Sequence, residues 1–240
     1  MAQRDTQRAF AFKTWGGARA GAGRPPKGVK AQLAHARRQA LTGREPVHVT
    51  VRVVRELEGL RQRGGYADVQ GALATQLARS DVRICHTSIQ RTHLHLIVEA
   101  DDAAALGKGM RGFLVALARR LNARAGRTGR AFDDRYHAAV LRTPTQVRHA
   151  LSYVLNNWRK HQEAARPGYV GLRLDPYSSA IGFAPWLQRR VIAEGPVRWP
   201  REGALPVAYP QSWLLSTGWR RGGGDISWFA VPAAQARMAH

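Results

Sequence analysis

The sequence predicts an α+β domain with an antiparallel sheet, for three reasons. Apolar and polar residues alternate over 47–54, as they do in a strand with one buried face. Residues 82–89 and 93–100 have the length and apolar content of two further strands. A stretch with helical spacing of apolar residues separates the first two strands, and the short link 90–92 joins the second to the third. We expect the folded domain to span residues 46–165.

The remaining elements complete a recognisable order. We expect helices over 66–79, 103–125 and 145–161, and a fourth strand over 136–142. The last of these helices should be capped near Thr143 to Thr145, with Pro144 in its first turn. In the second helix one apolar stripe is formed by Leu106, Met110, Leu114, Leu117 and Leu121. The order βαββαβ followed by a helix matches the ferredoxin-like split βαβ arrangement. Its sheet carries helices on one face and leaves the other face open to a ligand.

Two sections flank this domain. Residues 1–45 form a basic arm rich in Gly and Arg, with 10 basic and 2 acidic residues. Residues 166–240 are rich in Pro, Gly and Trp and show little periodicity. The role of this C-terminal extension is not evident from its composition.

The charge of the chain indicates a polyanionic partner. It has 38 basic and 16 acidic residues, a net charge of +22 and a pI of about 11.6, and nucleic acid is the usual partner of such a surface. No apolar run approaches the ~20 residues of a membrane helix, and residues 1–12 lack the apolar stretch of a signal peptide. The single Cys85 excludes an intrachain disulfide and a Cys-rich zinc site. We therefore expect a cytoplasmic, nucleoid-associated protein without a membrane partner.

Two histidines on the third predicted strand form a candidate metal site. Side chains alternate across a strand, so His93 and His95 share one face while Leu94 points to the other. Two imidazoles at this spacing on an open face can converge on one cation. Glu99 lies on the same face and is a weaker candidate ligand, because it stands at the end of the strand.

Tyr153 in the last predicted helix is a candidate nucleophile. It lies opposite the apolar face of that helix, which carries Val147, Leu151, Val154, Leu155 and Trp158. A phenol with a pKa near 10 is a poor nucleophile until its proton is removed or its target is polarised. A divalent cation on a scissile phosphate polarises that target. Attack would leave a covalent phosphotyrosine and a free 3′-hydroxyl, so strand joining would need no ATP.

Three strings in this region resemble the REP-associated tyrosine transposases, a branch of the single-tyrosine HUH transposases. They are SIQRTHLHLIVEA (Ser88–Ala100), DRYHAAVLRTP (Asp134–Pro144) and VRHALSYVLNNWRKH (Val147–His161). The resemblance covers about residues 14–161. The His-hydrophobic-His core is matched by His93, Leu94 and His95, and the nucleophilic tyrosine by Tyr153. Arg91 and Thr92 stand where the family commonly has Pro-Asn.

The resemblance implies a specific chemistry. Asn157 would be the third metal ligand, where some relatives carry Gln. The activity would be Mg²⁺- or Mn²⁺-dependent cleavage and transfer of single-stranded DNA at hairpin-forming palindromic repeats. Because two histidines are soft ligands for Mg²⁺, Mn²⁺ also suits the site. The protein would act as a monomer or a homodimer.

Basic residues outside these motifs are candidates for binding DNA. Arg24 and Lys27 lie in a Gly-Arg-Pro segment that resembles a minor-groove arm. The other candidates lie in the second and third predicted helices and in or next to the fourth predicted strand. They are Arg111, Arg119, Arg120, Arg135, Arg142 and Lys160. His137 is expected to lie near the site and to support it.

Three other functions fit the sequence less well. A non-catalytic nucleic-acid-binding regulator could use the same fold, but it would not need His93, His95, Tyr153 and Asn157. A ferredoxin-like RNA binder needs exposed aromatics on its central strands, which here carry His and Ile instead. A zinc hydrolase lacks a carboxylate at a helical spacing from histidine.

Overall fold

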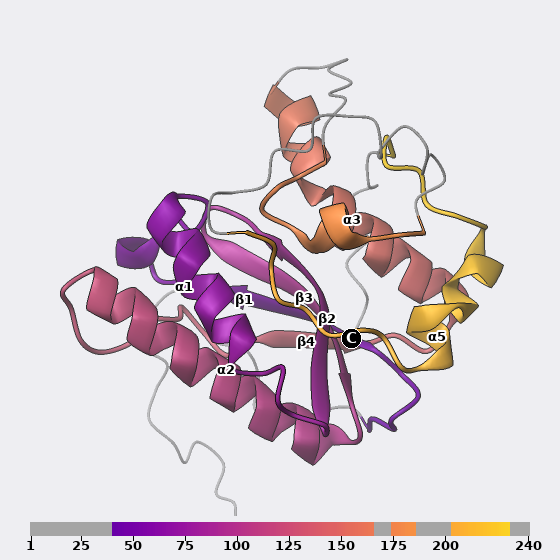
Figure 1. Ribbon diagram of the computed structural model, residues 1–240, viewed down its shortest axis with the longest axis horizontal. Helices are drawn as coiled ribbons and strands as arrows, with labels where there is room; N and C mark the ends of the chain where they lie inside the picture. The colour runs from indigo at the N-terminus through magenta and orange to yellow at the C-terminus, as the bar shows by residue number, and fades with distance from the viewer. Residues whose placement is uncertain (1–39, 166–173, 186–202, 231–240) are drawn as a thin grey trace, which may run out of the picture. The chain divides into compact units, whose positions relative to one another are not determined.

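The computed structural model describes residues 40–165, with the backbone alone over 160–165, and residues 174–185 and 203–230. A four-stranded antiparallel sheet lies at its centre (Figure 1). The strands are β1 (Val47–Arg52), β2 (Val82–Ile89), β3 (His93–Ala100) and β4 (His137–Val140), in the spatial order β2-β3-β1-β4. This confirms the predicted ferredoxin-like order, with β3 and β1 as the central strands.

One face of the sheet carries the first hydrophobic core. The helices α1 (Arg63–Ala74) and α2 (Ala103–Arg124) cover it, and a short 3-10 helix η1 (Arg55–Leu57) follows β1. Val49 of β1 and Leu96 of β3 are fully buried there against Phe113 of α2. Asp102 begins α2, since its carboxylate accepts a hydrogen bond from the N–H of Ala105 at 2.7 Å.

The added helix α3 (Pro144–Ala165) lies on the other face of the sheet (Figure 1). Its start is a capping box: Thr143 Oγ1 accepts from the Gln146 N–H, and Gln146 Oε1 accepts from the Thr143 N–H, both at 3.2 Å. Pro144 occupies the first turn, as expected. Val147 and Leu151 are fully buried in a second core, on the same sheet face as Ile97 of β3.

Parts of the C-terminal extension complete this second core. They include the 3-10 helices η2 (Ser179–Gly182) and η3 (Gly218–Gly222) and the short helix α5 (Trp213–Ser216). Trp219 and Trp228 are buried beside α3. The second face is therefore covered by α3 and the described parts of the extension over much of its area.

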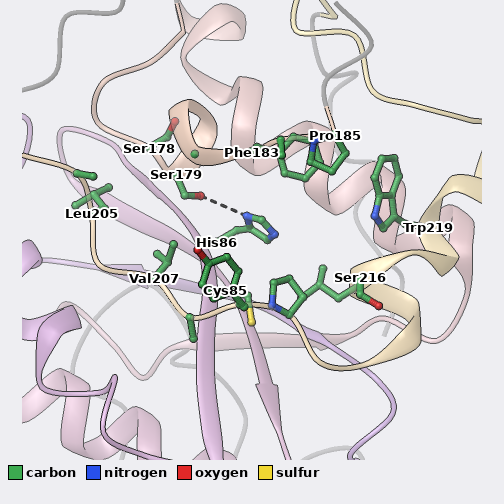
Figure 2. Close-up of a pocket in the computed structure, with 17 residues that line it drawn as sticks. Cys85, His86, Ser178, Ser179, Phe183, Pro185, Leu205, Val207, Ser216 and Trp219 are labelled. Atoms are coloured by element: carbon green, nitrogen blue, oxygen red, sulfur yellow. Dashed lines mark hydrogen bonds between the residues drawn. The ribbon is translucent and has the colours of Figure 1, made fainter. Parts of the chain in front are cut away.

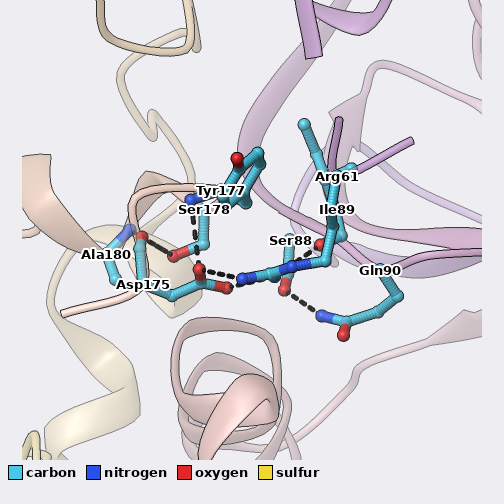
Figure 3. A network of polar contacts seen from close by, with 8 residues as sticks. All are labelled: Arg61, Ser88, Ile89, Gln90, Asp175, Tyr177, Ser178 and Ala180. Carbon is cyan, nitrogen blue, oxygen red and sulfur yellow. Dashed lines mark hydrogen bonds and ion pairs between the residues drawn. The ribbon is translucent and has the colours of Figure 1, made fainter. Parts of the chain in front are cut away.

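Two ionic contacts fix the extension to the sheet. Arg61 donates to both carboxylate oxygens of Asp175, at 2.9 and 2.7 Å, and to the carbonyl of Ile89 (Figure 3). Tyr177 stacks under the same guanidinium, with 4.4 Å from Cζ to the ring centroid. At the far end of β3, buried Glu99 accepts the backbone N–H groups of Gln211 and Ser212 and pairs with Arg83. Glu99 therefore anchors the chain rather than facing the histidine pair.

No helix among the described residues is long and apolar enough to cross a membrane. The three-section division of the chain into 1–45, 46–165 and 166–240 stays a prediction, because residues 1–39 lie outside the described part.

The Arg61–Asp175 contact yields a first prediction. The Asp175 side chain is fully buried, so Arg61→Met leaves an uncompensated charge. We expect the free energy of unfolding in urea to fall by roughly 2–3 kcal/mol, a value reduced because Arg61 is partly exposed. Adding Asp175→Asn should restore part of the loss.

The control is Arg91→Met, which breaks an exposed pair with Glu58 and should change the free energy of unfolding by less than about 1 kcal/mol. Equal effects of Arg61→Met and Arg91→Met would contradict the anchoring role.

Candidate metal and nucleophile site

His93 and His95 converge as the strand alternation predicts. Their Nε2 atoms lie 3.1 Å apart and the two rings are nearly perpendicular, with centroids 4.8 Å apart. Two imidazoles bound to one cation at metal–nitrogen distances of about 2.0–2.2 Å would have their nitrogens about 3.0–3.4 Å apart. The pair thus already has the separation that a shared cation requires.

The opposite nitrogen of each ring is held from behind. Thr92 Oγ1 lies 3.1 Å from Nδ1 of His93. Thr50 Oγ1 and His48 Nε2 lie 3.2 and 3.3 Å from Nδ1 of His95. A proton on Nδ1 leaves the Nε2 lone pair available, and side-chain partners of this kind orient metal-binding histidines in general.

The hydroxyl of Tyr153 reaches this pair from α3. Its Oη lies 3.5 Å from His95 Nε2, and the two rings meet edge to face with centroids 5.0 Å apart. The phenol is half-buried and its ring also contacts His48 at 5.9 Å between centroids. Tyr153 therefore lies over the histidines at the margin of the second core, against which its ring packs.

Asn157 supplies a further test of whether the residues fit a cation. It lies one turn after Tyr153 on α3, where side chains four residues apart are neighbours. Its side chain is buried, and neither amide atom has a hydrogen-bond partner among the described residues. A buried amide without a partner costs about 1–3 kcal/mol, which a ligand to its oxygen would offset.

The donor set is consistent with a small divalent ion. Among the described residues, no group of three or more His, Cys, Asp or Glu side chains is arranged to hold a metal ion by itself. The two imidazoles and one amide oxygen leave the remaining positions to water or to phosphate oxygens of a substrate. Such a mixed nitrogen and oxygen set suits Mn²⁺ and is acceptable to Mg²⁺.

Burial controls the protonation of the site. It raises the pKa of Tyr153, so the phenol holds its proton unless a neighbouring group draws it away. Burial, together with the charge of His137, lowers the pKa of His48 to about 4. His48 is therefore neutral at pH 7, and its Nε2 can accept the proton of His95 Nδ1.

The supporting residues of β1 were missed in the sequence. His48, Thr50 and Arg52 form the polar half of the VHVTVR alternation, and Thr50 pairs with His95 and Arg52 with His93. The signal was present, because the ferredoxin-like order places β1 beside β3. Arg52 is exposed next to the half-buried His93.

The proposed DNA-binding residues are not all brought to this site. Arg111, Arg119 and Arg120 are exposed on α2, which covers the opposite face of the sheet. Arg135, also exposed, lines a hollow of about 490 Å³ together with Arg111. Exposed Arg142 donates to the carbonyl of Ala40.

His137 pairs with Thr50 and so joins the face of the histidines, as expected. Arg24, Lys27 and the side chain of Lys160 lie outside the described part of the chain.

Comparisons with known proteins leave the family open. No family model matches the chain, and no curated protein matches it. A solved structure of a REP-associated tyrosine transposase bound to a REP hairpin is similar to this chain, with a TM-score of 0.48 and 16% sequence identity. The match covers 73% of this chain and 100% of that one.

The unpartnered amide of Asn157 gives a second prediction. Asn157→Leu removes a buried polar group without a partner, so the melting temperature should hold or rise, while affinity for Mn²⁺ should fall at least tenfold. Calorimetric titration with Mn²⁺ and thermal unfolding in EDTA measure the two effects. The matched control is Asn156→Leu, which breaks a 3.1 Å hydrogen bond to Ser227 and should instead cost about 1 kcal/mol. A destabilised Asn157→Leu protein with normal Mn²⁺ affinity would show the amide to be structural.

The buried histidines give a third prediction. The pKa values of His48 and His86 are both lowered to about 4, against about 6.5 in an unfolded chain. Below pH 6.5 the unfolded chain binds protons that the folded chain refuses, so stability present above that pH is lost as the pH falls towards 4. We expect a loss of roughly 3 kcal/mol per histidine over this window in EDTA. His48→Gln with His86→Gln should flatten the curve, and an unchanged slope would refute the assignment.

Proposed function

We propose that this chain is a metal-dependent single-stranded DNA endonuclease and strand transferase that forms a 5′-phosphotyrosine through Tyr153. The observation that carries the proposal is the placement of one phenol 3.5 Å from an imidazole nitrogen that is itself 3.1 Å from a second one. A nucleophile and a pair of cation ligands at this distance can act on the same phosphate.

The proposed reaction exchanges one phosphate ester for another. Tyr153 Oη forms a bond to the scissile phosphorus, and the bond from phosphorus to the 3′-oxygen breaks. The phenol loses its proton and the departing 3′-oxygen gains one, so charge and atoms balance. When bound, a divalent cation neutralises charge on the scissile phosphate and so supports the attack. A 3′-hydroxyl of another strand reverses the step, which makes the enzyme a strand transferase as well as an endonuclease.

The roles of the remaining residues follow from their contacts. His93, His95 and Asn157 would hold Mg²⁺ or Mn²⁺, with Thr92, Thr50 and His48 fixing the imidazole rings. Positioning of this kind is the larger part of catalysis in phosphoryl transfer. The raised pKa of Tyr153 keeps the phenol protonated until a substrate is in place.

The identity of the substrate is inferred from charge and access. A net charge of +22 suits a nucleic-acid strand. Tyr153 is half-buried between α3 and the sheet, where a flexible single strand enters more easily than a duplex. The motifs that resemble REP-associated tyrosine transposases make hairpin-forming palindromic repeats the first substrates to try.

The decisive experiment is covalent capture. End-labelled hairpin oligonucleotides with single-stranded flanks, taken from palindromes near the coding region, are mixed with the full chain and Mg²⁺ or Mn²⁺. We expect a band resistant to detergent that carries the label 3′ of the cut. Tyr153→Phe should reduce it by at least 10³-fold while binding in EDTA stays within about twofold.

Matched variants separate chemistry from folding. Tyr136→Phe and His149→Ala should leave capture unchanged, whereas His93→Ala or His95→Ala should abolish its dependence on metal. Capture that persists in Tyr153→Phe would identify another nucleophile. Absence of cleavage by the wild-type chain on every hairpin, despite binding, would favour a non-catalytic DNA-binding role.

A further inference from the structure

A second cavity opens on the same sheet face as the candidate site. It lies between β2, η2, residues 204–210 and η3 (Figure 2), and its volume is about 370 Å³. Small-molecule pockets range over about 300–1,000 Å³, so this one can take a ring system but not a large ligand. The chemistry proposed for Tyr153 does not use it.

The walls of the cavity select an uncharged group. Its lining contains no Asp, Glu, Lys or Arg among the described residues, so a phosphate or carboxylate would lose its hydration there without a counter-charge. Three aromatic side chains, Phe183, Tyr209 and Trp219, contribute to the walls. Phe183 also meets the ring of His86 edge to face, at 5.6 Å between centroids. Flat, neutral rings are the ligands that such walls bind best.

A buried donor without a partner faces this space. Trp219 is fully buried, and its Nε1–H has no hydrogen-bond acceptor among the described residues. Figure 2 shows the nitrogen edge of the indole turned towards the side of the cavity where His86 lies. An orphaned buried N–H costs about 1–3 kcal/mol, so a ligand atom that accepts from it would be favoured.

His86 presents a complementary polar group. Ser179 Oγ accepts from the Thr87 N–H at 3.0 Å and lies 3.5 Å from His86 Nδ1. The imidazole is buried and neutral, so one ring nitrogen donates and the other accepts. Together with Trp219, the cavity offers both donor and acceptor capacity, which is what the edge of a nucleobase requires.

Strand register places the cavity close to the candidate site. His86 pairs with Ile97, two residues beyond His95 on β3, and Ser88 pairs with His95. His86 therefore lies one strand across and two residues along from His95. At the usual spacings within a sheet, their Cα atoms are about 8 Å apart. That is roughly two nucleotides of a stacked single strand. Arg220 and Arg221 are exposed directly after Trp219, where they can contact the backbone of such a strand.

We propose that this cavity holds one unpaired nucleobase of the same DNA strand whose phosphate is presented to Tyr153, and so helps to choose the position of the cut. The identification of the ligand as DNA rests on the proposed function. The pocket itself rests on the neutral aromatic walls, the orphaned indole N–H and the neighbouring imidazole. An enzyme that reads a base in such a pocket needs a single strand or an extruded nucleotide.

The test compares strands with and without bases. Fluorescein-labelled dT20, dA20 and dC20 are titrated with the full chain in EDTA, beside a 20-mer of abasic residues with the same phosphates. Base stacking on aromatic side chains is worth about 1–3 kcal/mol, so at least one base-bearing strand should bind about 5–150-fold tighter than the abasic strand. Fluorescence anisotropy measures each affinity without any cleavage step.

Two variants assign the preference to this cavity. Trp219→Phe removes the N–H donor and keeps an aromatic wall. Gly182→Phe adds a ring at a lining position where a new Cβ would meet nothing within 4 Å. Both should lower the preference for bases at least threefold and leave abasic binding unchanged. Trp213→Phe, at an exposed tryptophan outside the cavity, should keep the wild-type preference.

An NMR measurement on the wild type tests the pocket without relying on the folding of a variant. The indole N–H signal that disappears in Trp219→Phe should shift when dT20, but not the abasic 20-mer, is added to the ¹⁵N-labelled wild type. Retention of the full base preference by both variants would overturn the pocket, as would a failure to bind any of the strands. Pocket-dependent base preference without covalent capture by Tyr153 would instead refute the nuclease and keep the pocket.

Discussion

Two imidazole nitrogens held 3.1 Å apart are the constraint on which the proposed chemistry depends. Without a cation, a proton on one Nε2 can link the rings as an N–H···N hydrogen bond, and the surroundings orient both rings in this arrangement. It is imposed by register: the pairing of Thr50 with His95 brings the polar half of β1 behind the ring. The hydroxyl of Thr92 does the same for His93. Loss of this support would free the rings to turn apart.

The packing of α3 and of the C-terminal extension against the sheet positions the same site. The apolar side of α3 packs into the second core, which the C-terminal extension completes. This packing holds Tyr153 over the sheet, beside His95. The contacts of Arg61 with Asp175, and of Glu99 with the backbone of residues 211 and 212, hold the extension near the two ends of the edge strand β2. Because each contact buries a carboxylate, its main effect is to fix the position of the extension rather than to add much net stability.

Local patterns predicted most of the fold. The β2 and β3 boundaries, the capping of α3 at Thr143 and the apolar stripe of α2 all follow from periodicity and end signals that need no tertiary information. The convergence of His93 with His95 was equally accessible, because strand alternation fixes it. The end of β1 was placed two residues too late, since Val53 and Val54 are apolar but lie past the last ladder pair.

Features that depend on contacts between distant segments could not be predicted from the sequence. Asn156 and Asn157 look polar and exposed in the sequence, yet both are buried because α3 is covered on two sides. His48 gained a role only from its place beside β3. Glu99 looked like a possible ligand and instead binds backbone N–H groups more than a hundred residues away. The cavity beside His86 exists only where the extension meets β2, and no local pattern marks it.

The most direct measurement is the anomalous diffraction of crystals soaked in Mn²⁺. The account predicts one strong peak within about 2.0–2.3 Å of Nε2 of both His93 and His95, with the hydroxyl of Tyr153 beside it. A crystal in which the cation binds elsewhere, or in which the two rings turn away from each other and from the phenol, would contradict the central claim.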